Sequence, residues 1–193
     1  MSIRLSAALV VASVIATPVL AQTVPAARVA VVDTTRIARD CTACRAAGAQ
    51  LTTQENTLRT RAQALQTQLQ TEGAPIQTAV NALNGRQPDA ALQARITAFE
   101  TKQRAAQTEL TNGQRNLQSI QANVNSQIGT RLVAIVNTVA AQRGANIAID
   151  KGSALYSAAA IDITDGVLAA LNQQLPSVSV TPLPQQQQAP QGR

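Results

Sequence analysis

The fold is decided by residues 92–124, which read LQARITAFETKQRAAQTELTNGQRNLQSIQANV. Apolar residues recur here at alternating steps of four and three positions, with Gln103 and Gly113 occupying two of the apolar slots. This spacing is typical of the ~3.5-residue period of a left-handed coiled coil. A single thin apolar stripe cannot surround a globular core, so we expect a long helix that buries one seam against a partner helix.

The partner helix is expected in residues 50–83, where leucine or isoleucine recurs at helical spacing. An Asn-Gly pair and a Pro-Asp pair mark a chain reversal, so we place the tip of a helical hairpin at 84–89 and the whole arm at 45–143. Gly73-Ala74-Pro75 predicts a kink or a short interruption, because proline removes a helix hydrogen bond. Gly113 predicts a second point of flexibility in the return helix.

A small body is expected from the residues that flank the arm. Residues 22–44 contain the β-branched run Val29-Ala30-Val31-Val32-Asp33, which predicts a strand, and Thr34 or Thr35 can cap the helix that follows. Residues 144–175 are expected to hold the rest of the body: Gly144 as a helix C-cap, strands at 146–150 and 154–157, and a closing helix capped by Asp162 or Thr164. The predicted fold class is therefore α+β, with a long antiparallel coiled-coil hairpin projecting from a small β-sheet body.

The first residues indicate export. Residues 1–21 have the organisation of a secretory signal peptide: Arg4, an apolar run, and the small-residue cleavage signal Val19-Leu20-Ala21. A retained amphipathic anchor is the alternative, but the cleavage signal favours removal.

The composition argues against catalysis. The chain has no His and no Trp, one Phe and one Tyr. Histidine is the commonest general acid–base group, and histidine and cysteine are common metal ligands, so a chain without His and with two neighbouring Cys has little material for either role. We therefore predict a protein that is not an enzyme and uses no cofactor or metal.

The positive charge lies on the arm. The chain has 16 Lys and Arg against 10 Asp and Glu, and residues 45–143 hold ten of the basic residues and five of the acidic ones. The basic residues towards the tip can attract acidic segments of a partner or anionic lipid headgroups, and they are Arg86, Arg95, Lys102 and Arg104. The alternative is a solvated helix with a modest charge bias. Nucleic acid is not predicted as a partner, because an exported chain rarely meets it and aromatic residues for base stacking are lacking.

Cys41 and Cys44 form a C-x-x-C motif where the arm begins. Three interpretations are open: a redox pair, a local disulfide, or two small buried thiols. No thioredoxin-like βαβ pattern surrounds the motif, which favours the two structural interpretations.

The end of the chain is predicted to be disordered. Residues 176–193 are rich in proline and contain four consecutive glutamines.

The body is expected to share its sheet with copies of itself, because two or three short strands are marginal alone. The strand residues that we expect to serve the oligomerisation body are Val29, Val31, Ile147, Ile149 and Leu155.

The order strand, long helical hairpin, strand and closing helix resembles the Skp/OmpH family of periplasmic chaperones. The resemblance covers residues from about 28 to 175 and rests on the first strand with Arg36-Ile37, Ile147-Ala148-Ile149-Asp150, Ala154-Leu155-Tyr156, and Asp162-Ile163-Thr164 leading to Val167-Leu168. It implies a homotrimer with a β-barrel-like body and three arms around a cavity.

The resemblance also implies an ATP-independent holdase function in the periplasm, in which the cavity holds unfolded outer-membrane β-barrel proteins and prevents their aggregation. A structural coiled-coil spacer or adaptor of the cell envelope is one alternative, and a thiol-redox protein is another. The spacer explains the heptads but not the strands that bracket them, and the redox protein lacks a surrounding fold for its chemistry.

Overall fold

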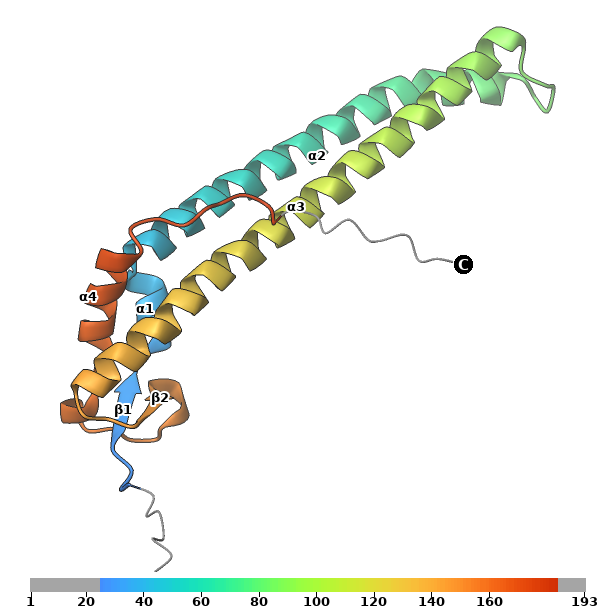
Figure 1. Cartoon of the computed structure of the whole chain (residues 1–193). Coiled ribbons are helices and arrows are strands. Elements are labelled where there is room, and N and C mark those ends of the chain that lie inside the picture. The colour runs from blue at the N-terminus through green and yellow to red at the C-terminus, as the bar shows by residue number, and fades with distance from the viewer. Residues whose placement is uncertain (1–24, 184–193) are drawn as a thin grey trace, which may run out of the picture.

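The computed structural model describes residues 25–183 and contains a small body and one long arm (Figure 1). The body holds a sheet of two strands, β1 (Val29–Val32) and β2 (Ile147–Asp150), which pair in parallel with Val29 opposite Ile147. The arm consists of two antiparallel helices, and the fold class predicted from the sequence is confirmed. None of the helices within residues 25–183 has the length and apolar character needed to cross a membrane.

The strand predicted at 154–157 is wrong. The carboxylate of Asp150 accepts the N–H of Gly152 at 2.7 Å, which starts a 3₁₀ turn (Lys151–Ser153) directly after β2. A second 3₁₀ turn (Ala159–Ile161) brings the chain back to the sheet, where Asp162 makes a single bridge to Val31. Residues 154–157 form a loop instead of a strand, and Leu155 and Tyr156 are exposed on it.

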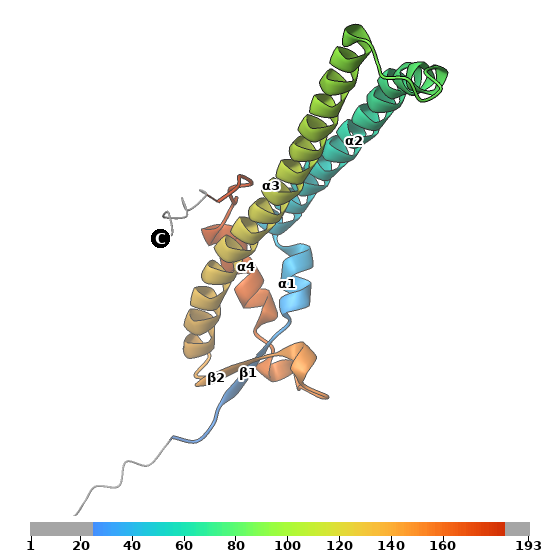
Figure 2. The ribbon, with the colours of Figure 1, turned by 90° about the vertical axis from the view of Figure 1, so that its right-hand side faces the viewer.

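Two short helices and the base of the return helix cover the sheet, as Figure 2 shows. Helix α1 (Thr34–Asp40) is capped by Asp33, whose carboxylate accepts the N–H of Arg36 at 2.7 Å, and not by either of the predicted threonines. Helix α4 (Thr164–Gln174) closes the body. These elements bury one core, made of Ala30, Val32, Ile37, Cys41, Ala43, Ile135, Ala140, Ile163, Val167 and Leu171.

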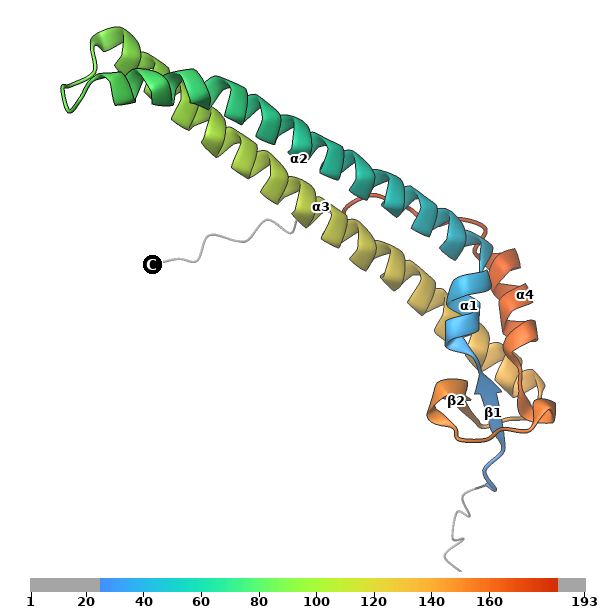
Figure 3. The same ribbon diagram turned by 180° about the vertical axis from the view of Figure 1, so that it is seen from behind.

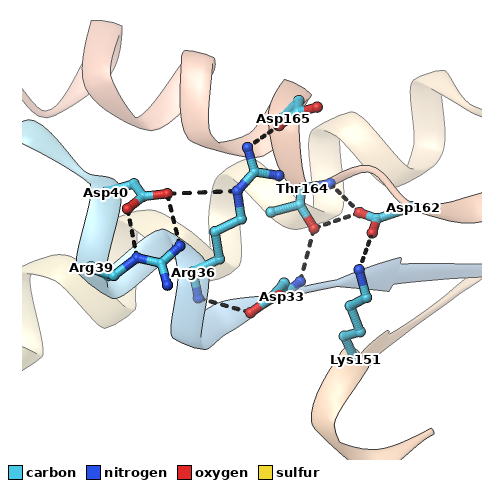
Figure 4. Close-up of polar contacts among 8 residues, drawn as sticks. All are labelled: Asp33, Arg36, Arg39, Asp40, Lys151, Asp162, Thr164 and Asp165. Atoms are coloured by element: carbon cyan, nitrogen blue, oxygen red, sulfur yellow. Dashed lines mark hydrogen bonds and ion pairs between the residues drawn. The ribbon is translucent and has the colours of Figure 1, made fainter. Parts of the chain in front are cut away.

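A polar network joins β1 to the start of α4 (Figure 4). The buried hydroxyl of Thr164 accepts the N–H of Asp33 at 2.9 Å and donates to Asp162 at 2.5 Å. Asp162 also accepts the N–H of Thr164 and a hydrogen bond from Lys151, both at 2.9 Å. At the outer edge of the same network Arg36 forms an ion pair with Asp165 at 2.7 Å. The network ties segments about 130 residues apart in sequence into one unit.

The arm is built from α2 (Thr42–Ala82) and α3 (Ala90–Gln142). At the tip Asn84 and Gly85 have φ values of 46° and 85°, which is the left-handed conformation expected for an Asn-Gly reversal. Asp89 caps α3 by accepting the N–H of Leu92 at 2.8 Å. Gly144, with φ of 73°, ends α3 as the sequence predicts.

Helix α2 continues through Pro75 without an interruption. The outer end of α2 runs in a different direction from its inner part (Figure 3), as expected where proline removes one hydrogen bond and bends a helix. Of the two possibilities predicted at 73–75, the structure therefore contains a bend.

Gly73 and Gly113 are positions of close helix contact. A Cβ at Gly73 would lie 2.8 Å from Cζ of Phe99, and a Cβ at Gly113 would lie 2.6 Å from Cδ1 of Leu58. Each glycine therefore makes room for one large side chain of the other helix. The sequence-based interpretation of both as flexible points missed this packing role.

The disorder predicted for the end of the chain is wrong for residues 176–183. This segment is extended and lies along the arm, where Val178 and Val180 pack against apolar residues of both helices. The remainder of that prediction, residues 184–193, lies outside the described residues, as does the predicted signal peptide at 1–21.

The packing role of Gly73 can be tested with two matched substitutions. Alanine is favoured over glycine inside a helix by roughly 0.5–1 kcal/mol. We expect Gly129→Ala to gain this stability, because a Cβ there meets nothing within 4 Å. We expect Gly73→Ala to lose the gain, since the new methyl group collides with Phe99. Urea unfolding followed by circular dichroism measures both, and equal stabilisation would contradict the packing role.

The pKa of Asp162 is lowered from 3.8 to about 2, first by the hydrogen bond from Thr164 and then by the one from Lys151. A carboxyl group with a lowered pKa stabilises the folded state above its unfolded pKa, and this stability is lost as the pH falls through the folded pKa.

We therefore expect Asp162→Asn to lower the free energy of unfolding by about 2 kcal/mol near pH 7. The effect should shrink between about pH 4 and pH 2, where the wild-type carboxyl takes up its proton. Urea unfolding at both ends of this range is the measurement. Glu55→Gln, at an exposed carboxylate of α2, is the control. The same loss for Asp162→Asn at both pH values would rule out this role of its charge.

Candidate functional site

The arm offers open grooves along the contact between its helices. One groove of about 540 Å³ is lined by Leu58, Gly113 and Leu117, together with polar residues of both helices. A second, of about 460 Å³, is lined by Leu65 and Phe99 among others. Both have apolar floors because the seam between the helices is too thin to be covered by its own side chains. The arm can therefore offer several shallow apolar contacts.

Ion pairs across the arm neutralise part of its charge. Arg61 donates to both carboxylate oxygens of Glu109 at 2.5 and 3.0 Å, and Lys102 lies 2.5 Å from Glu72. The hydrogen bond from Lys102 holds the pKa of Glu72 below its ordinary value, and the one from Arg61 does the same for Glu109. Such exposed pairs contribute little stability, but they join specific positions of the two helices.

The four basic residues predicted for the tip fall into two groups. Arg86 and Arg95 line one pocket of about 470 Å³ at the tip. Neither forms an ion pair within residues 25–183. Lys102 shares a second pocket of about 250 Å³ with Arg95 but is paired with Glu72. Arg104 lies 4.0 Å from Glu100 one turn away. The structure thus brings Arg86 and Arg95 together and offsets the charge of the other two.

The apolar residues predicted for the oligomerisation body differ in their exposure. Leu155 is 110% exposed, and Ile147 and Ile149 are 44% and 38% exposed. Val29 is 36% exposed, whereas Val31 is only 1% exposed. Val31 is buried within its own chain and is not available to a partner, which corrects its assignment to a shared surface.

Two further exposed apolar residues were missed. Val133 is 62% exposed and lines a pocket of about 330 Å³ between α3 and β2 with Val136 and Ile149. Tyr156 is 85% exposed beside Leu155. Val133 could have been recognised as exposed from the sequence, because it lies off the apolar stripe of α3 that faces the core of its own chain.

Strand β2 lies at an edge of the sheet, because β1 is its partner on one side and no other strand pairs with it within residues 25–183. An open strand edge presents unpaired backbone groups that another strand can join. The edge and the exposed apolar side chains occur in the same small body.

Cys41 and Cys44 form a disulfide in the structure. Cys41 is fully buried and separates α1 from α2, and its sulfur accepts the N–H of Cys44 at 3.1 Å. The side chain of Asn172 accepts the N–H of Thr42 at 2.8 Å, so α4 contacts the same joint. The disulfide therefore lies where the body meets the arm.

The part of the chain that the structure describes contains no group of three or more His, Cys, Asp or Glu side chains that could hold a metal ion. The surfaces described above are suited to binding polypeptide, lipid or another copy of the chain.

A small sheet-and-helix body with one long helical hairpin is the arrangement that the resemblance of the sequence implies. The sequence model of the family described as "Outer membrane protein (OmpH-like)" matches residues 28–171. The chain therefore belongs to the OmpH-like family, and the resemblance to Skp/OmpH chaperones is confirmed.

The fold is similar to a crystal structure from Caulobacter crescentus CB15, described as that of a candidate outer membrane chaperone (OmpH-like). The two share 19% sequence identity with a TM-score of 0.68, over 86% of this chain and 96% of the other. No curated protein matches the chain.

Proposed function

We propose that the chain is an ATP-independent holdase of the periplasm, which binds unfolded outer-membrane β-barrel proteins between helical arms and prevents their aggregation. The observation that carries the proposal is the arm itself, whose open apolar grooves run along the helix seam and whose tip holds two arginines without ion-pair partners among the described residues. Membership of the OmpH-like family supports it.

The chemistry of the client fits these surfaces. Strands of an outer-membrane barrel alternate apolar and polar side chains, and in water the apolar ones drive aggregation. Several shallow grooves can each hold an apolar side chain weakly, so that binding needs no fixed client sequence. Arg86 and Arg95 can attract acidic client segments, and they also suit anionic lipid headgroups.

A homotrimer is part of the proposal. Leu155 and Tyr156 are exposed on the body, and the pocket beside Val133 offers an apolar surface that a neighbouring copy could fill. The open edge of β2 can pair with a strand of another subunit. Three copies joined in this way would surround a cavity with their arms.

The proposal is tested by the molar mass of the purified mature protein and by light scattering of an outer-membrane barrel diluted from urea. We expect a mass of three chains and suppressed aggregation. Leu155→Asp should yield monomers that protect poorly, because a charge in an apolar subunit contact is costly to bury. Thr52→Asp, at an exposed position of α2, is the control. A monomeric wild type without protection would favour the envelope spacer.

The effect of Arg86 and Arg95 on client capture can be separated from the effect of the net charge of the arm. We expect Arg86→Gln with Arg95→Gln to slow client capture roughly threefold or more at low salt and to reduce its salt dependence, since steering depends on uncompensated charge. Lys102→Gln with Arg104→Gln removes the same net charge from sites offset by Glu72 and Glu100, and should change capture less. Stopped-flow capture rates at two salt concentrations measure the difference. If both double substitutions slow capture equally, only the net charge of the arm matters and the two arginines at the tip have no special role.

A further inference from the structure

The segment that follows α4 lies in the groove at the base of the arm. Figure 1 shows it leaving α4 and running along the arm to α3. Val178 and Val180 are half-buried against a cluster of both helices, made of Ala47, Leu51, Ile120, Val124 and Ile128. Ser179 between them is exposed, as are Ser177 and Thr181 on either side. The segment therefore has the alternating pattern of a half-buried strand. We call residues 177–183 the strap.

Three polar side chains of α3 hold the backbone of the strap. The amide of Gln127 accepts the N–H of Ser179 at 2.9 Å and donates to the carbonyl of the same residue at 3.0 Å. Asn123 donates to the carbonyl of Thr181 at 3.0 Å. Further along, the hydroxyl of Ser119 accepts the N–H of Leu183 at 2.9 Å. All of these contacts reach main-chain groups of the strap.

The three contacts are possible because the four-residue spacing on helix α3 matches the two-residue spacing on the extended strap. Positions 119, 123 and 127 lie four apart on α3, which corresponds to about 6 Å along a helix. Their partners 183, 181 and 179 lie two apart, which corresponds to about 6.6 Å along an extended chain. A row of polar residues at every fourth position can thus pair with every second residue of a strand that runs antiparallel to the helix. The polar row of the groove therefore hydrogen-bonds to the backbone of the strap, while Val178 and Val180 pack on its apolar residues.

We infer that this groove is a binding site for extended polypeptide whose small apolar residues alternate with polar ones, and that the strap occupies it in the free protein. The inference rests on the proposed function for the identity of the natural occupant, which is a strand of an unfolded outer-membrane barrel. Such a strand carries the same alternation and the same backbone groups as the strap. Client strands would enter the groove by displacing residues 177–183.

Peptide binding tests the site directly. The probe is a fluorescent peptide with the sequence of residues 176–183, PSVSVTPL, and the readout is its anisotropy with the full mature chain. Because a tethered segment competes at high effective concentration, we expect weak binding to the wild type. Val178→Asp with Val180→Asp should release the strap and tighten binding of the peptide by at least about tenfold.

A matched pair of substitutions tests the polar row. Added to the released variant, Gln127→Ala should weaken peptide binding about tenfold, because the bidentate contact with the backbone is lost. Gln121→Ala, at an exposed position of the same helix, should leave it unchanged. A peptide of the same composition with adjacent valines, PSSVVTPL, should bind more weakly to the released variant. Ser179→Pro is a second way to release the strap, since it removes the N–H that Gln127 accepts.

The outcomes separate this site from the proposed function. If neither released variant binds the peptide more tightly than the wild type, or if Gln127→Ala and Gln121→Ala act alike, the groove is not an extended-peptide site. Suppression of barrel aggregation could still hold in that case. If a released variant binds the peptide tightly but does not suppress barrel aggregation, the peptide site is supported and the holdase function is overturned. If the site serves clients, the released variant should retain an unfolded barrel longer than the wild type.

Discussion

The parallel pairing of β1 with β2 is the constraint on which the rest of the structure depends. Parallel strands require a long crossover connection, and in this chain the crossover is the whole arm. The side chain of Asn146 reinforces the pairing, since it accepts the N–H of Arg28 at 2.7 Å and donates to the carbonyl of Ala26 at 2.9 Å. Because both ends of the arm are held side by side, the two helices between them must run out and back.

This arrangement separates stability from binding. The body contains the largest core cluster and the buried polar network around Thr164, so it holds the fold together. The arm buries only a narrow row of side chains, and large parts of its helix faces stay exposed. A binding surface of this kind is broad and shallow, which suits clients that have no fixed shape. The strap and the tip arginines place two different chemistries at the two ends of that surface.

Features encoded by local backbone chemistry could be predicted from the sequence. The tip at Asn84-Gly85, the cap at Asp89 and the end of α3 at Gly144 each follow from residues that favour one backbone conformation. The coiled-coil period indicated the arm, and the family resemblance indicated how body and arm are connected. For the candidate site, the sequence indicated which charges lie near the tip but not which of them are offset by acidic neighbours.

The misses have several causes, and two of them, at Gly113 and at Val31, depend on tertiary contacts. The β-propensity of residues 154–157 was overridden by a turn that starts at Asp150. The room that Gly113 makes for Leu58 joins positions 55 residues apart, and no local pattern records it. The strap was obscured by its proline- and glutamine-rich surroundings, although the alternation from Ser177 to Thr181 was visible. Val31 is buried where its strand bridges to Asp162, a residue far along the chain that no local pattern connects with it.

The paired contacts across the arm also restrict how such arms can change in length. Leu58 fits against Gly113, and Phe99 fits against Gly73, so the helices are matched at two distant levels. An insertion in one helix alone would shift every residue beyond it relative to its contact partner on the other helix. Longer or shorter arms in related chains should therefore arise through equal changes in both helices, added in whole heptads so that the seam keeps its orientation.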